Sequence, residues 1–234
     1  MPSASPLSSF KLWVFDLDGT LIDSRYDLVT AVNATLDNLG LSPLPEATIV
    51  SYIGDGAEDL IRRSLESAGM PTPVICGLFS ETMAWFLDYY GEHCLDRTVP
   101  YPGALELLDT VAARGHGMAV LTNKPEKPAL KILAHLGILE RFSHVIPGDG
   151  PLGKKPDPTG MAYILKAVNT LPHESVLVGD SLQDLQTARN AGVSFIAFLG
   201  GLGDSEAIAA ATPDVEVTHL SEITALLEPT ATRP

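Results

Sequence analysis

The sequence predicts an α/β fold: a doubly wound, parallel-sheet (Rossmann-like) core with a small all-helical cap domain inserted after the first strand. Four short apolar runs along the chain each stop at a polar residue or a glycine, and helical patterns flank them. Such alternation of strands and helices is typical of a doubly wound sheet. A long stretch after the first run shows helical spacing alone, which predicts the insert.

The strands of the core are expected where the apolar runs lie, and its helices where apolar residues recur at helical spacing. Each run is continuously apolar rather than alternating, which is typical of strands buried on both faces of a parallel sheet. The predicted strands are residues 12–15, 118–121, 176–178 and 195–199. The predicted core helices are residues 104–114, 125–136, 158–168 and 182–191.

The insert is predicted because apolar positions such as Leu28, Val32 and Leu36 repeat at helical spacing and no strand-like run follows them before Arg97. Pairs of prolines divide this stretch into separate helices. The segment "VPYPG" at residues 99–103 is expected to be the hinge by which the chain returns to the sheet. The predicted domains are a core of residues 1–22 and 98–234 and a cap of residues 23–97.

Composition places the chain among globular proteins. Apolar residues make up 45% of the 234 residues and charged residues 19%, far from a disordered composition. No apolar run approaches the roughly 20 residues that span a bilayer. The start, "MPSASPLSSFK", has no basic stretch before an apolar run and is expected to be a short floppy leader. Cys76 and Cys94 predict neither a metal cluster nor a disulfide framework, so we expect a cytoplasmic monomer or homodimer.

The net charge limits the classes of partner that the protein is expected to bind. The formal net charge of −14 argues against nucleic acid or an anionic membrane. It also fits poorly with an anionic substrate unless a bound cation compensates, so a metal site is expected.

Asp16 and Asp18, in the apolar stretch "WVFDLDGTLI", are the first candidates for that site. Two residues apart on an extended strand, their side chains point the same way. Burying both ionised without a partner would be costly, whereas Mg²⁺ takes one or two carboxylates and leaves room for phosphate. Gly19 would let the chain turn closely past the site. The alternative is a strand-end turn with solvated aspartates.

Polar residues also follow other predicted strands: Thr122 and Asn123 after one, Asp180 after another. Ligands of open α/β sheets bind beyond the carboxyl ends of the strands. We therefore expect these residues and Asp16 to meet in one crevice, the alternative being three unrelated strand ends.

Four segments, in order, resemble the motifs of the haloacid-dehalogenase-like (HAD) phosphohydrolase superfamily. They are "DLDGTLID", "VLTNKP" with Thr122, "GKKPDP" with Lys155, and "VLVGDSLQDLQTARNAG" with Asp180 and Asp184. The resemblance runs from residue 11 to about residue 227. It implies a Mg²⁺-dependent phosphatase that acts on a small anionic phosphate ester through an aspartyl-phosphate.

The resemblance also implies a role for each residue. Asp16 would be the nucleophile and a metal ligand. Asp18 would be the general acid and then the base, with its backbone carbonyl on the metal. Aspartic acids are normally ionised at pH 7, so burial or a negative neighbour would have to keep Asp18 protonated. The further implied roles are phosphoryl binding by Thr122, Asn123 and Lys155, metal ligation by Asp180, a supporting contact without direct ligation from Asp184, and shaping of the pocket by Gly19 and Ser181.

Three other reactions of the superfamily can be weighed against the residues. The chain has no lysine between Lys11 and Lys124, which removes the cap lysine needed for phosphonate hydrolysis through a Schiff base. Dehalogenating members lack an acid at the position of Asp18. Mutases of the β-phosphoglucomutase branch usually have glutamate where this chain has Gly179, so a hydrolase is favoured.

Within the hydrolases, "YIGDGAEDLIRRSL" at residues 52–65 resembles the cap of bacterial phosphoglycolate phosphatases and implies hydrolysis of 2-phosphoglycolate to glycolate and phosphate. Arg63 aligns with the cap arginine of that family and either meets a substrate carboxylate or forms a salt bridge on the helix surface; Arg62 is expected to lie at the surface. The family's aromatic-glycine stretch is replaced by "LGGLGDSEA". A pyrophosphatase, a sugar-phosphate phosphatase or phosphomutase, and more remotely a non-catalytic binding protein remain alternatives.

Overall fold

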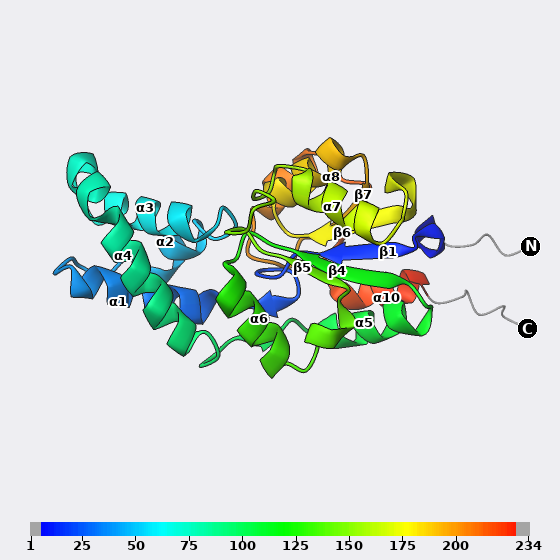
Figure 1. Cartoon of the computed structure of the whole chain (residues 1–234), viewed down its shortest axis with the longest axis horizontal. Coiled ribbons are helices and arrows are strands. Elements are labelled where there is room, and N and C mark those ends of the chain that lie inside the picture. Colours follow the sequence, from blue (N-terminus) through cyan, green and yellow to red (C-terminus); the bar gives the residue numbers. More distant parts are fainter. Residues whose placement is uncertain (1–5, 228–234) are drawn as a thin grey trace, which may run out of the picture.

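The computed structural model describes residues 6–227 and centres on one six-stranded parallel sheet, in the order β5-β4-β1-β6-β7-β8 (Figure 1). Helices cover both faces of the sheet, so the predicted α/β, Rossmann-like class is confirmed. The strands are β1 (Leu12–Phe15), β4 (Gly117–Leu121), β5 (His144–Ile146), β6 (Ser175–Gly179), β7 (Ser194–Phe198) and β8 (Val215–Val217).

Strand β1 lies at the centre, paired with β4 on one side and β6 on the other. Its side chains alternate between the two hydrophobic cores: Trp13 and Phe15 pack in one, Leu12 and Val14 in the other. All four are fully buried, which explains why the run is continuously apolar. Both neighbours of β1 are parallel to it, so their carboxyl ends meet at one edge of the sheet.

The two layers of helices follow from the same alternation. Figure 1 shows α5, α6 and α10 on one face and α7 and α8 on the other. Their buried apolar residues belong to the core of the face that they cover. The helices of the core, including the short α9, are α5 (Ala104–Ala113), α6 (Glu126–His135), α7 (Thr159–Ala167), α8 (Leu182–Ala191), α9 (Ser205–Ala210) and α10 (Leu220–Leu227).

The stretch between the first strand and the rest of the sheet folds into four helices at one end of the molecule (Figure 1). They are α1 (Arg25–Asn38), α2 (Glu46–Val50), α3 (Ala57–Ser67) and α4 (Thr72–His93). The short strands β2 (Ile22–Asp23) and β3 (Val99–Pro100) pair antiparallel at its base. The segment expected to be a hinge therefore begins as a strand, which the sequence analysis did not predict.

Three further features were not predicted. The edge strands β5 and β8 have three residues each, too few to give a periodic signal. The leader is not floppy throughout, because Leu7 and Phe10 are buried in the core; residues 1–5 lie outside the described part of the chain. Helices α9 and α10 were also missed, since six and eight residues make only about two turns each.

No helix within residues 6–227 is long and apolar enough to cross a membrane. Cys76 is exposed and Cys94 is buried, and both are free thiols.

Asp27 on α1 ties the two ends of the helical segment together. It is buried, and its Oδ2 accepts hydrogen bonds from the N–H of Arg97 (3.1 Å), the N–H of Thr98 (2.9 Å) and the hydroxyl of Thr98 (2.7 Å). The start of the segment is thereby fixed to the chain that leaves it.

We predict that Asp27→Ala lowers the free energy of unfolding by about 2–4 kcal/mol, because it leaves buried N–H groups without an acceptor. Asp37→Ala, at an exposed position of the same helix, is the matched control and should change it by less than about 0.5 kcal/mol. Urea unfolding measures both. Equal effects of the two substitutions would show that the tie contributes nothing.

Candidate active site

Three adjacent strands end at the candidate site. Asp16 follows β1, Thr122 follows β4 and Asp180 follows β6, and β1 lies between the other two. The ladder continues one step past β1, where the N–H of Asp16 donates to the carbonyl of Val178 (2.9 Å). The structure thus brings the three residues to one edge of the sheet, as predicted.

Lys155 connects two of the buried acids. Its Nζ lies 2.5 Å from Asp16 Oδ1 and 2.6 Å from Asp184 Oδ1, and all three side chains are buried. One oxygen each of Asp16, Asp180 and Asp184 lie within 4.8 Å of one another. Three buried carboxylates therefore lie close together, and a single ammonium contacts two of them.

Burial and the neighbouring carboxylates raise the pKa values of two of the acids. Burial raises the pKa of Asp16 to about 8 although Lys155 opposes the rise, and the charges of Asp184 and Asp180 add to it. Burial and then the charge of Asp184 raise the pKa of Asp180 to about 6. Burial lowers the pKa of Lys155, but the two carboxylates beside it outweigh that effect and raise it. The group lacks positive charge.

A divalent cation fits this donor set. Mg²⁺ binds hard oxygen ligands and would supply the missing charge. Asp184 is already occupied by hydrogen-bond donors: Oδ1 accepts from Lys155, and Oδ2 accepts from the N–H (3.1 Å) and hydroxyl (2.5 Å) of Ser181. Asp180 also accepts three hydrogen bonds, but from a hydroxyl and two N–H groups rather than from an ammonium, so it keeps more negative charge for a metal than Asp184 does.

Asp180 is held in place by its surroundings. Its Oδ1 accepts from the hydroxyl of Thr20 (3.0 Å), and its Oδ2 accepts from the N–H groups of Leu202 (2.8 Å) and Gly203 (3.0 Å). The "LGGLGDSEA" segment thus supplies main-chain donors to the acidic group. A carboxylate has about four acceptor sites, so these bonds leave lone pairs for a cation.

Two glycines make the close packing possible. Gly19 has φ +87°, a left-handed backbone, and a side chain there would collide with the carboxylate of Asp180. A side chain at Gly179 would collide with the carboxylate of Asp184. Both positions bring the backbone directly against the acids.

Asp18 has a different partner from Asp16. Lys124 Nζ lies 2.8 Å from Asp18 Oδ1 and 3.0 Å from Oδ2, and Ser24 donates its hydroxyl to Oδ1 (2.5 Å). Lys124 also donates to the hydroxyl of Tyr90 (2.5 Å). Burial or a negative neighbour was expected beside Asp18, whereas the structure places a buried cation, Lys124, there.

The role of Lys124 was missed. The residue stands within the quoted motif "VLTNKP", but its proximity to Asp18 depends on how two strand ends meet. Tyr90, whose hydroxyl also contacts Lys124, comes from α4 and belongs to none of the four motifs.

Asn123 positions neighbouring loops. Its Nδ2 donates to the carbonyls of Gly54 (2.9 Å) and Lys155 (3.1 Å), and its Oδ1 accepts from the N–H of Lys155 (2.7 Å). The amide side chain is thus engaged with main-chain groups and fixes the backbone that carries Lys155.

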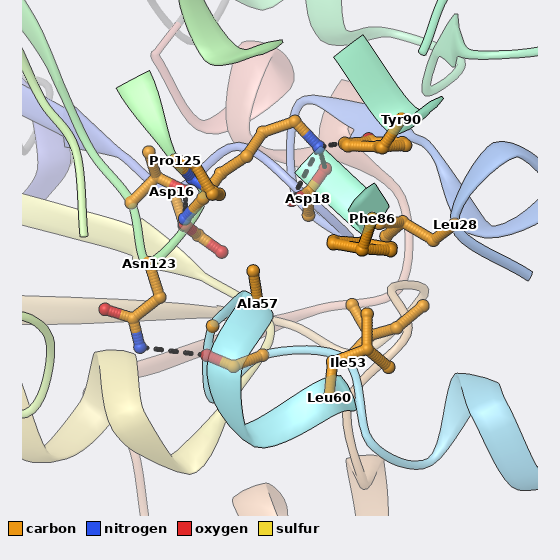
Figure 2. Close-up of a pocket in the computed structure, with 14 residues that line it drawn as sticks. Asp16, Asp18, Leu28, Ile53, Ala57, Leu60, Phe86, Tyr90, Asn123 and Pro125 are labelled. Atoms are coloured by element: carbon orange, nitrogen blue, oxygen red, sulfur yellow. Dashed lines mark hydrogen bonds and ion pairs between the residues drawn. The ribbon is translucent and has the colours of Figure 1, made fainter. Parts of the chain in front are cut away.

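These residues face a pocket between the sheet edge and the helical segment (Figure 2). Figure 2 shows Asp16 and Asn123 on one side, Ile53 and Leu60 on the other, and Asp18 beside Phe86 and Tyr90. The apolar wall consists of Leu28, Ile53, Ala57, Leu60 and Phe86. The pocket thus has a charged floor and an apolar wall.

The arginines of the helical segment do not line this pocket. Arg63 pairs with Asp55 (3.0 Å), and its guanidinium lies over the ring of Tyr52 (4.5 Å to the centroid). Arg62 lies over the ring of Phe79 (4.3 Å). The arrangement of Arg63 matches the salt-bridge alternative.

Contacts beside the pocket join the helical segment to the core. Lys154 donates to the carbonyl of Asp55 (2.9 Å) and to Asp59, and Gln183 donates to the side chain of Asp55. With the bond from Asn123 to Gly54, these contacts hold the helical wall over the charged floor.

Comparison with known proteins gives one family. Residues 13–198 match the model of the haloacid dehalogenase-like hydrolases. A protein of Pseudomonas putida named phosphoglycolate phosphatase is 36% identical over 90% of this chain and 77% of its own. One of Nitrosospira multiformis with the same name is 37% identical over 93% and 96%. The crystal structure of a predicted phosphoglycolate phosphatase from Haemophilus somnus has a TM-score of 0.88 at 31% identity, covering 94% of this chain and 99% of that one.

We predict that Mg²⁺ raises the melting temperature more at pH 8 than at pH 6, since the pKa values of Asp16 and Asp180 are raised to about 8 and about 6. A group whose pKa is raised in the folded state stabilises the fold at low pH and loses that contribution as the pH rises through the folded-state pKa. At pH 8, bound Mg²⁺ would take the place of the protons that Asp16 and Asp180 lose.

Thermal unfolding with and without magnesium chloride at both pH values measures this shift. Asp180→Asn should reduce it, whereas Asp204→Asn, at an exposed helix cap, is the control that should not. A magnesium effect of the same size at both pH values would contradict the prediction.

Proposed function

We propose a reaction for this chain, which belongs to the haloacid dehalogenase-like hydrolase family and is a phosphoric monoester hydrolase. The proposed reaction is Mg²⁺-dependent hydrolysis of 2-phosphoglycolate to glycolate and phosphate through an aspartyl-phosphate. The observation that carries it is the position of Asp16, which stands at the sheet edge in contact with Lys155 and close to Asp180 and Asp184, and which also faces the pocket.

The first step is attack on phosphorus by a carboxylate oxygen of Asp16. The new P–O bond forms as the bond to the leaving oxygen breaks, and protonated Asp18 gives its proton to that oxygen. Lys155 and the hydroxyl of Thr122 stabilise the charge on the phosphoryl oxygens. Thr122 is buried and lines the pocket beside Asp16, a position that suits this role.

The second step regenerates the enzyme. Water attacks phosphorus and passes a proton to the carboxylate of Asp18, and the bond from phosphorus to Asp16 breaks to release phosphate. A bound Mg²⁺ would supply positive charge to the phosphoryl group in both steps. Asp16, Asp180 and the main-chain carbonyl of Asp18 would hold it, with Asp184 and Ser181 supporting the site.

We infer that residues 23–97 act as a cap domain over this centre. The contacts from Lys154, Gln183 and Asn123 to residues 54–59 hold the helical wall against the core. Closure of such a wall excludes water from the reacting group and selects the leaving group.

The choice of 2-phosphoglycolate is supported by the names of the relatives, several of them similar over almost the whole chain. A phosphomutase is disfavoured because Gly179 packs directly against Asp184, where the glutamate typical of that branch would not fit.

Asp16→Asn is expected to lower kcat by on the order of a thousandfold or more, since an amide cannot form the acyl-phosphate. Release of phosphate from 2-phosphoglycolate measures the effect. The exposed Asp149→Asn would change only the acceptor for the N–H of Glu126 and serves as the control. Activity of Asp16→Asn close to that of the wild type would contradict covalent catalysis.

Removal of divalent cations with a chelator should abolish hydrolysis, and added Mg²⁺ should restore it, because the acidic group otherwise lacks the charge needed to hold an anionic ester. A panel of esters under both conditions, including pyrophosphate and a sugar phosphate, tests the substrate as well. A higher kcat/KM for another ester than for 2-phosphoglycolate would overturn the proposed substrate and leave the chemistry unchanged.

A further inference from the structure

The pocket offers a leaving group very little positive charge. Among the residues between 6 and 227 that line it, Lys124 is the only cation. The helical wall opposite is apolar, and Arg63 is paired with Asp55 elsewhere. An anionic leaving group therefore finds one cation in this pocket, and it would share that cation with Asp18.

Lys124 is placed to meet such a charge. Its side chain is only 1% exposed, and its Nζ lies between the carboxylate of Asp18 and the hydroxyl of Tyr90, with the ring of Tyr90 4.7 Å away. Burial raises the pKa of Tyr90 well above its usual value, so the residue carries a neutral hydroxyl. A hydroxyl that accepts one hydrogen bond can still donate its own hydrogen, so ammonium and hydroxyl together can bind a carboxylate.

We infer that Lys124 and Tyr90 bind the carboxylate of the leaving group and thereby select esters whose anion lies one carbon from the bridging oxygen. This inference rests on the proposed function. The bridging oxygen must come within hydrogen-bond reach of Asp18 to receive its proton. Lys124 Nζ lies 2.8 Å from that same carboxylate, so a second anion close to the bridging oxygen reaches the ammonium at the same time.

The spacing sets the class of substrate. In a (phosphooxy)carboxylate with one intervening carbon, the carboxylate can contact Lys124 while the bridging oxygen contacts Asp18. The rest of the leaving group would lie against Leu28 and Phe86, which offer no polar partner. A neutral leaving group of the same length gains nothing from Lys124, because the ammonium then stays with Asp18.

The test compares 2-phosphoglycolate with 2-hydroxyethyl phosphate, which has the same length and no carboxylate. In Lys124→Met, kcat/KM for 2-phosphoglycolate should fall about tenfold to a hundredfold more than for 2-hydroxyethyl phosphate, mainly through KM, since a hydrogen bond to a charged group is lost. Lys127→Met, at an exposed position of α6, is the matched control and should keep the wild-type preference. Lys124→Arg should restore part of it.

Two further measurements keep the inference falsifiable if Lys124→Met does not fold. Tyr90→Phe removes only the hydroxyl and should weaken 2-phosphoglycolate selectively, by a few fold. Glycolate should inhibit the wild type competitively and Tyr90→Phe less strongly.

The outcomes separate the two proposals. Equal losses on both esters in the variants would show that Lys124 and Tyr90 act only through Asp18, which overturns this inference and leaves the phosphatase reaction intact. A wild type that prefers 2-hydroxyethyl phosphate would overturn it as well. Failure of the wild type to hydrolyse either ester in the presence of Mg²⁺ would instead overturn the proposed function.

Discussion

The burial of three carboxylates around the ammonium of Lys155 is the constraint on which the rest of the site depends. One cation cannot balance Asp16, Asp180 and Asp184, and the raised pKa values of the first two express that imbalance. The fold holds the group together with donors on every side, from Thr20 and Ser181 to the N–H groups of residues 202 and 203. A site with such a deficit of positive charge is suited to a divalent cation, which would offset the carboxylate charge that Lys155 leaves unbalanced.

The two buried lysines contact different parts of the site. Lys155 belongs to the acidic group at the sheet edge, where the proposed phosphoryl transfer takes place, whereas Lys124 faces Asp18 and the helical segment. Tyr90 connects the two parts of the molecule, since it reaches from α4 to a lysine that follows β4. In the proposed reaction the sheet edge would carry the chemistry, and Lys124 from the core together with Tyr90 from the inserted helices would select the leaving group.

The sequence predicted the parts of this structure that depend on local pattern. The central strands could be predicted because burial on both faces makes them continuously apolar. The acids of the site could then be predicted because they stand directly after those strands. The strands β5 and β8 were not visible, since three residues show no period. The roles of Lys124 and Arg63 could not be predicted for a different reason. The role of a long charged side chain depends on the residues that it contacts in the folded chain. For Lys124 that is Tyr90, and for Arg63 it is Asp55 and Tyr52, all of them on other elements or loops.

The apolar wall has an evolutionary consequence. Two of its members come from α3, and one each comes from α1, from α4 and from the loop before α3. Apart from Phe86, whose ring stacks on Tyr90, exchanging one of them would reshape the space for the leaving group without changing a carboxylate or a lysine of the site. A lineage could thus acquire new esters by replacing wall residues one at a time while its reaction stayed the same, and the helices would diverge faster than the strands.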